Sequence, residues 1–172
     1  MQVSTVPRST PVALSLALAA AGPVAIGAIL AMRFQTASPL AMVPAITFGV
    51  VGVTSPALYI ATALSGDAPT LAQMARALQL SLGAFGIALA GLILPAAFLS
   101  LSSIENMTTI AVATVALAGA AVLALVRLAV ELGRERPTTS LLRVFVFGAW
   151  TVATIGIAAR LWWSFAMTEV LS

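Results

Sequence analysis

Cysteine, histidine and lysine are absent from this chain. Without cysteine there is no disulfide, no thiolate metal ligand and no thiol nucleophile. Without histidine the chain lacks the commonest transition-metal ligand and the usual general base at neutral pH. The sequence also has no glycine-rich phosphate loop, and no hydroxyl stands beside a base that could activate it. We therefore expect no catalytic residue, no cofactor and no metal site, and a protein that is not an enzyme.

The chain also contains few charged residues: 8% of the residues are charged, whereas 61% are hydrophobic. A water-soluble protein of 172 residues needs far more polar surface than this. A hydrocarbon core of ~30 Å needs about 20 apolar residues per helix, so the chain has room for about five spans and little else. We predict a single integral membrane domain, residues 1–172, folded as an all-α polytopic bundle with some helices kinked at proline or glycine.

Polar breaks divide the apolar sequence into the predicted spans. Kinks are expected at Pro23 in the first span and at Pro44 and Pro56 in the second, which would be bent or broken. An alternative for the first span is a signal peptide, because Arg8 precedes an apolar run and then small alanines. The apolar run continues to Leu30, so we favour an uncleaved span. The spans are expected at roughly 11–32, 39–64, 80–99, 108–130 and 141–167.

Residues 70–79 carry a polar stripe ahead of the third span. Thr70 and Gln73 have the spacing of a capping box, in which each side chain bonds the other's backbone. Gln73, Arg76 and Gln79 lie three residues apart, with apolar residues on the opposite side. We interpret 70–79 as an amphipathic segment that lies at the membrane–water interface, with its polar face toward water. The alternative is that Arg76 pairs with a lipid phosphate or with a partner's carboxylate.

The arginines predict the orientation of the chain in the membrane. Five spans alternate their connections between two sides, and short cytoplasmic loops are enriched in basic residues. One side receives Arg8, Arg76, Arg127, Arg134, Arg136 and Arg143, and the other receives Arg33 and Arg160. We therefore expect a cytoplasmic amino terminus and a carboxyl terminus on the opposite side. Arginine without lysine is typical of a GC-rich bacterial genome, which favours location in the cell inner membrane. The sequence has no cluster of basic and aromatic residues that would indicate nucleic-acid binding.

Hydroxyl side chains crowd the second span. A small-molecule path beside a broken second span would use Thr47, Thr54, Ser55, Tyr59 and Thr62, because interrupted helices often mark transporter sites. No acidic residue falls at mid-membrane, although a proton- or sodium-coupled carrier normally needs one. We favour packing by these hydroxyls and keep a small channel or carrier as the alternative function.

Aromatic and small residues supply the remaining candidates. Trp162 and Trp163 fit an aromatic interface belt, and Arg160 one turn earlier can snorkel to that interface or pair with another subunit. Small residues let helices approach closely, either within the bundle or against a partner helix. They form stripes in the third span (Gly83, Gly86, Ala90, Gly91), the fourth (Ala116, Gly119, Ala120, Ala124) and the fifth (Ala149, Ala153, Gly156).

Three segments share their layout with a known family. They are the amphipathic lead-in Leu71–Leu78, then Leu82-Gly83 followed by Pro95, and finally Leu125–Glu131 before a charged loop. Over roughly 39–163 this order resembles the Yip1 family of small five-span membrane proteins, although the tyrosine- and glycine-rich signatures of its eukaryotic members are missing. The resemblance implies a role in membrane organisation and partner binding, with no catalytic residue to carry over.

The sequence thus predicts a non-enzymatic integral membrane protein. We expect an accessory, structural or membrane-organising subunit that packs against other membrane proteins, or against itself, within the lipid bilayer. The side chains expected to contact a partner or lipid are Gln73, Arg76, Gln79, Arg160, Trp162 and Trp163.

Overall fold

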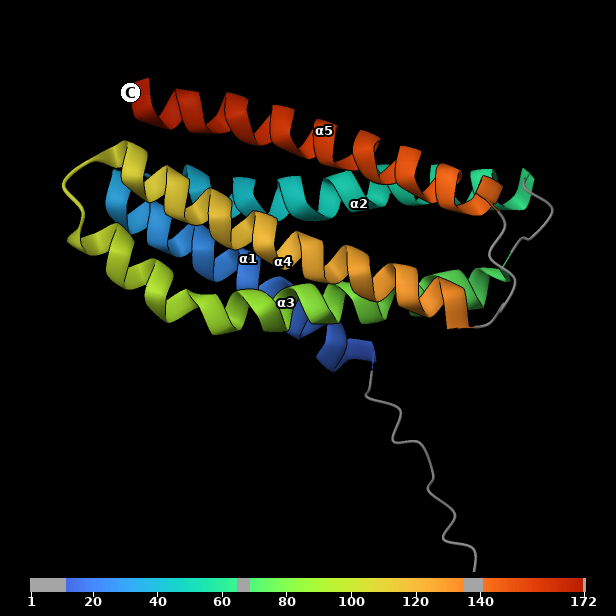
Figure 1. Cartoon of the computed structure of the whole chain (residues 1–172). Helices are drawn as coiled ribbons and strands as arrows, with labels where there is room; N and C mark the ends of the chain where they lie inside the picture. The colour runs from blue at the N-terminus through green and yellow to red at the C-terminus, as the bar shows by residue number, and fades with distance from the viewer. Residues whose placement is uncertain (1–11, 65–68, 135–140, 172) are drawn as a thin grey trace, which may run out of the picture.

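The computed structural model describes residues 12–64, 69–134 and 141–171, and within these ranges the regular structure is entirely α-helical. Long helices lie side by side in one bundle (Figure 1). The predicted all-α bundle is confirmed. The helices are α1 (Val12–Phe34), α2 (Ser38–Leu64), α3 (Leu71–Ser102), α4 (Asn106–Arg134) and α5 (Leu141–Leu171).

Helix length and composition indicate a membrane-spanning bundle. Four of the described helices, α2 to α5, are long and apolar enough to cross a bilayer. Helix α1 has 23 residues, and its one charged residue, Arg33, lies in the last turn. Its apolar segment Ala19–Phe34 is shorter than these four, so the fifth span remains a prediction. The chain is therefore a multi-pass membrane protein.

Helix α3 begins as the sequence predicts. The Gln73 backbone N–H donates to the Thr70 hydroxyl at 3.2 Å, and the Thr70 backbone N–H donates to the Gln73 side-chain oxygen at 2.7 Å. This capping box satisfies two donors that the helix itself cannot pair. The helix then runs for 32 residues, about 48 Å, which exceeds the hydrocarbon thickness. The interfacial position of 70–79 remains a prediction.

The prolines do not interrupt the helices. Helix α2 continues through Pro44 and Pro56, so the second span, expected to be bent or broken, is not broken. Each proline removes one backbone bond, but hydrocarbon offers the rest of the backbone no alternative partner, so the remaining helical bonds persist. Helix α3 likewise continues through Pro95 and curves in its C-terminal part (Figure 1).

Helix α1 lies at the centre of the bundle. It packs along α2 on one side and along α3 on the other, and α3 packs along α4. Helix α5 lies mainly against α2 and touches α4 over a short stretch. The buried side chains form one cluster around Leu30, Phe85, Leu89 and Phe165 and a second around Leu58, Met74, Leu128 and Trp150.

Two glycines of α1 allow neighbouring backbones to come close. A Cβ atom at Gly27 would lie 2.6 Å from the Pro39 carbonyl oxygen, and one at Gly22 would lie 2.7 Å from the Leu89 Cβ atom. Side chains do not tolerate such distances, so the approach of α1 to α2 and α3 requires glycine here. The small-residue stripes predicted from the sequence do not include these two positions.

Gly27→Ala should lower the free energy of unfolding by about 1–3 kcal/mol, the usual cost of overpacking. The clash is with backbone, so α1 or α2 must shift to relieve it. Gly119→Ala in α4 is the matched control, because its Cβ would have no atom within 4 Å. The control should be neutral or slightly stabilising. Thermal unfolding in mild detergent measures both, and equal melting temperatures would contradict the close approach.

Candidate functional site

The hydroxyls of α2 are occupied by the helix's own backbone. Thr47, Thr54, Ser55 and Thr62 each donate to the carbonyl oxygen four residues earlier, over 2.5 to 2.9 Å. Tyr59 is half-buried and packs against the cluster around Leu58. Hydroxyls held in this way satisfy themselves within an apolar setting. The geometry of the residues expected to line a path therefore favours packing.

Two tryptophans tie the inner face of α5 to its neighbours. The Trp150 indole N–H donates to the Thr54 carbonyl of α2 at 2.8 Å, in a buried position. The Trp162 indole N–H donates to the Thr114 hydroxyl of α4 at 2.8 Å. Trp162 therefore faces the bundle, whereas Trp163 is 58% exposed. Because hydrocarbon provides no acceptor, these two bonds orient α5 about its own axis.

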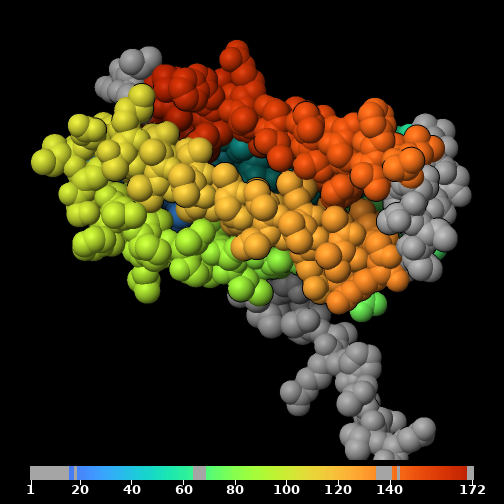
Figure 2. Space-filling view, in the orientation of Figure 1, coloured from blue at the N-terminus to red at the C-terminus, as the bar shows by residue number. Residues whose placement is uncertain are grey.

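A hollow separates part of α4 from α5 (Figure 2). In Figure 2 the α2 atoms are visible at the floor of the hollow, beneath the surfaces of α4 and α5. Thr151 and Thr154 of α5 each have a buried hydroxyl oxygen with no hydrogen-bond partner among the described residues. The α4–α5 contact is less extensive than the contacts of α1 with α2 and α3 and of α3 with α4.

Polar contacts gather at the end of the bundle where α1 meets α2. Glu169 of α5 is 8% exposed and accepts a hydrogen bond from the Thr36 hydroxyl at 3.0 Å. The Arg33 guanidinium donates to the Ile104 carbonyl of the α3–α4 loop at 2.7 Å. Together these bonds connect the α1–α2 turn to α5 and to the α3–α4 loop.

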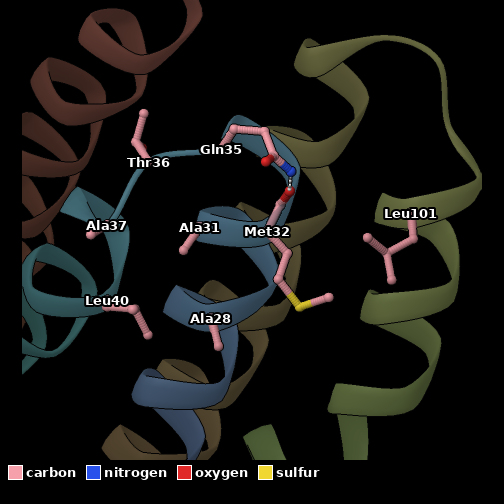
Figure 3. Close-up of a pocket in the computed structure, with 8 residues that line it drawn as sticks. All are labelled: Ala28, Ala31, Met32, Gln35, Thr36, Ala37, Leu40 and Leu101. Atoms are coloured by element: carbon pink, nitrogen blue, oxygen red, sulfur yellow. Dashed lines mark hydrogen bonds between the residues drawn. The ribbon is translucent and has the colours of Figure 1, made fainter.

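Beside this turn lies an open pocket of about 540 Å³ (Figure 3). Gln35 directly follows α1 with a backbone φ of 56°, and its side-chain amide donates to the Met32 carbonyl at 2.7 Å. The lining of the pocket is mostly apolar and includes no charged side chain. Its lining residues are Ala28, Ala31, Met32, Gln35, Thr36, Ala37, Leu40 and Leu101.

The small residues of α5 point away from the bundle. Ala149, Ala153 and Gly156 are all exposed. By contrast, Ala116 and Ala120 of the fourth-span stripe are buried inside the bundle. In the third-span stripe, Gly86 is buried, whereas added Cβ atoms at Gly83 and Gly91 would meet no atom within 4 Å. Among these stripes, that of α5 is exposed throughout.

Helix α5 is the least buried candidate span among the described helices. The most apolar window of α5 is 11% buried inside the protein, against 28% for α4. Large exposed side chains flank its small residues, with Phe145 74% and Val152 73% exposed. Arg160 is also exposed on α5. The outward face of α5, defined here by Phe145, Ala149, Val152, Ala153, Gly156, Arg160 and Trp163, therefore contacts little of the described chain.

The polar stripe of α3 lies near the opposite end of the bundle from the C-terminal part of α5 (Figure 1). Gln73 and Gln79 are half-buried, and Arg76 is exposed. On α4, Glu131 forms ion pairs with Arg127 at 2.7 Å and Arg134 at 3.0 Å. The structure therefore does not bring the expected contact residues together, because Arg76 and Arg160 lie far apart along the bundle.

Sequence reasoning missed Trp150 and Thr114 as anchoring residues. A tryptophan in mid-span is the available signal, because its indole N–H needs an acceptor inside the membrane. The identity of the acceptor depends on which helices are neighbours, and the sequence does not state this. Within the described residues, no group of three or more acidic, histidine or cysteine side chains could hold a metal ion.

No protein-family model matches this sequence, no curated protein is similar to it, and no solved structure matches its fold. The resemblance of its layout to the Yip1 family therefore remains a prediction.

Trp150→Phe should lower the free energy of unfolding by about 1–2 kcal/mol, because it removes a buried hydrogen bond and some packing volume. Trp163→Phe is the matched control, since its ring is 58% exposed, and it should change stability by less than about 0.5 kcal/mol. Thermal unfolding followed by circular dichroism measures both variants. A larger loss for the control would contradict the anchoring role of Trp150.

Proposed function

We propose that this protein is a non-enzymatic accessory subunit of the membrane, which acts by packing against other membrane proteins through the outward face of α5. The observation that carries the proposal is the contrast between the two sides of α5. Its inner face is bonded to α2 and α4 through Trp150 and Trp162, while its outward face contacts little of the described chain. A helix held in this way presents a fixed surface to the bilayer.

Small residues suit this surface to helix–helix contact. Lipid tails provide no hydrophobic drive for association, so close backbone approach and van der Waals contact decide whether helices bind. A Cβ atom at Gly156 would meet nothing within 4 Å, which leaves room for a neighbouring backbone. Phe145 and Trp163, at either end of the face, would flank an incoming helix.

The use of polar groups inside the bundle also supports a structural role. The hydroxyls of α2 donate to their own helix, and Ser81 of α3 donates to the Ala124 carbonyl of α4 at 2.7 Å. Among the described residues these bonds join or stabilise helices, which agrees with a structural role. The layout that resembles the Yip1 family agrees with partner binding as the activity.

The proposed orientation has the amino terminus in the cytoplasm of a bacterial cell and the carboxyl terminus across the inner membrane. It rests on basic residues that include Arg76, Arg127 and Arg134, since the start of α3 and the end of α4 lie at one end of the bundle (Figure 1). Reporter domains fused to the two termini should respond from opposite compartments. Responses from the same compartment would contradict an odd number of spans.

Gly156→Ile should reduce the amount of co-purifying membrane protein at least about tenfold, because the larger side chain blocks backbone approach at the centre of the α5 face. Gly119→Ile is the matched control on the lipid-facing side of α4, and it should leave co-purification unchanged. Purification from the native membrane in mild detergent, with quantitative mass spectrometry, measures both. Recovery of the unaltered protein as a lone monomer would refute the proposed function.

A further inference from the structure

Arg160 lies on the outward face of α5 in line with the small residues. Ala149, Ala153, Gly156, Arg160 and Trp163 follow one another at alternating intervals of four and three residues, which keeps them on one side of a helix. All five are exposed. Arg160 forms no hydrogen bond or ion pair with any other described residue. The outward face of α5 therefore has small residues that leave space for a neighbouring helix, together with an Arg160 guanidinium that has no partner among the described residues.

Arg160 lies within the candidate membrane span of α5. The candidate span Val144–Glu169 has 26 residues and measures about 39 Å. Arg160 lies about 5 Å beyond the middle of this span. If the middle of this span lies at the centre of a hydrocarbon core that extends about 15 Å to either side, the Arg160 backbone lies about 10 Å inside the boundary.

Snorkelling does not bring Arg160 to a lipid phosphate at this depth. An extended arginine side chain reaches about 7 Å. The phosphates lie about 20 Å from the bilayer middle, which leaves about 8 Å between them and the guanidinium. A phosphate could reach Arg160 only if the bilayer thinned locally. A protein group at the same depth is therefore the better partner.

The acidic residues of the described chain do not supply that group. Glu131 pairs with Arg127 and Arg134 near the other end of the bundle. Glu169 is buried, bonds Thr36, and lies nine residues, about 14 Å, further along α5. Glu105 lies in the loop between α3 and α4.

A second copy of this chain does not fit the face either. Two copies share one orientation in the membrane, so a symmetric pair along α5 would bring Arg160 against its own equivalent. Two like charges inside hydrocarbon repel strongly because the low dielectric screens them little. This repulsion disfavours a symmetric pair of copies and favours a different protein with a negative charge at this depth.

We propose that the outward face of α5 binds a transmembrane helix of another membrane protein through an ion pair between Arg160 and a carboxylate of that helix. This identifies the partner's chemistry and rests on the proposed function. The partner helix carries one Asp or Glu in an apolar span, and small residues opposite Ala153 and Gly156. Pairing neutralises both charges, each of which is costly alone in the bilayer. Trp163, one turn beyond Arg160, shields the pair from the headgroup side.

The absence of cysteine makes the test specific. Ala153→Cys provides the chain's single thiol, to which a photoactivatable cross-linker is attached in the native membrane. We expect an adduct with one foreign protein, whose cross-linked peptide is an apolar segment containing Asp or Glu. Combining Ala153→Cys with Arg160→Leu should reduce the adduct about tenfold, whereas Arg160→Lys should keep it within about twofold. Val122→Cys on α4, 56% exposed, is the control site and should yield no adduct that depends on Arg160.

The outcomes separate this inference from the proposed function. An adduct that survives Arg160→Leu at full yield would overturn the ion pair and leave partner binding standing. An adduct at twice the mass of the chain, or one with lipid alone, would overturn the proposal that the partner is a different protein with a carboxylate in its helix. Absence of any co-purifying protein would refute the proposed function as well. Melting temperatures confirm that the variants fold, and Arg160→Gln replaces Arg160→Leu if the latter does not.

Discussion

Hydrocarbon contains no hydrogen-bond partner, and the bundle depends on this constraint more than on any single contact. Each polar group within the spans must find its partner inside the protein or remain unpaired. The threonines of α2 bond their own backbone, and the two indoles of α5 reach acceptors on α2 and α4. The same constraint preserves the helices where proline removes a bond, as at Pro56.

A few polar side chains within the spans have no hydrogen-bond partner among the described residues. The buried hydroxyls of Thr151 and Thr154 lie along the inner side of α5, where its contact with α4 is short. Arg160 lies on its outer side, without a partner in the described chain. Helix α5 thus carries several polar groups without a partner among the described residues, whereas α1, α3 and α4 share a cluster of buried apolar side chains.

Features that depend on local sequence could be predicted, and features that depend on helix neighbours could not. The capping box at Thr70 and the pair of Arg127 with Glu131 follow from residue spacing alone. The close approach at Gly27 requires the turn of α2 to lie against α1, which no spacing reveals. For the same reason, the sequence offered the same two interpretations for three similar stripes of small residues, although that of α4 is partly buried and that of α5 faces outward.

The acceptors that hold α5 belong to segments that the ribosome makes earlier. Thr54 and Thr114 both precede α5 in the sequence, so both acceptor residues exist before the fifth helix is synthesised. The two indole bonds that hold α5 against α2 and α4 therefore form only after the chain has been made as far as Trp162.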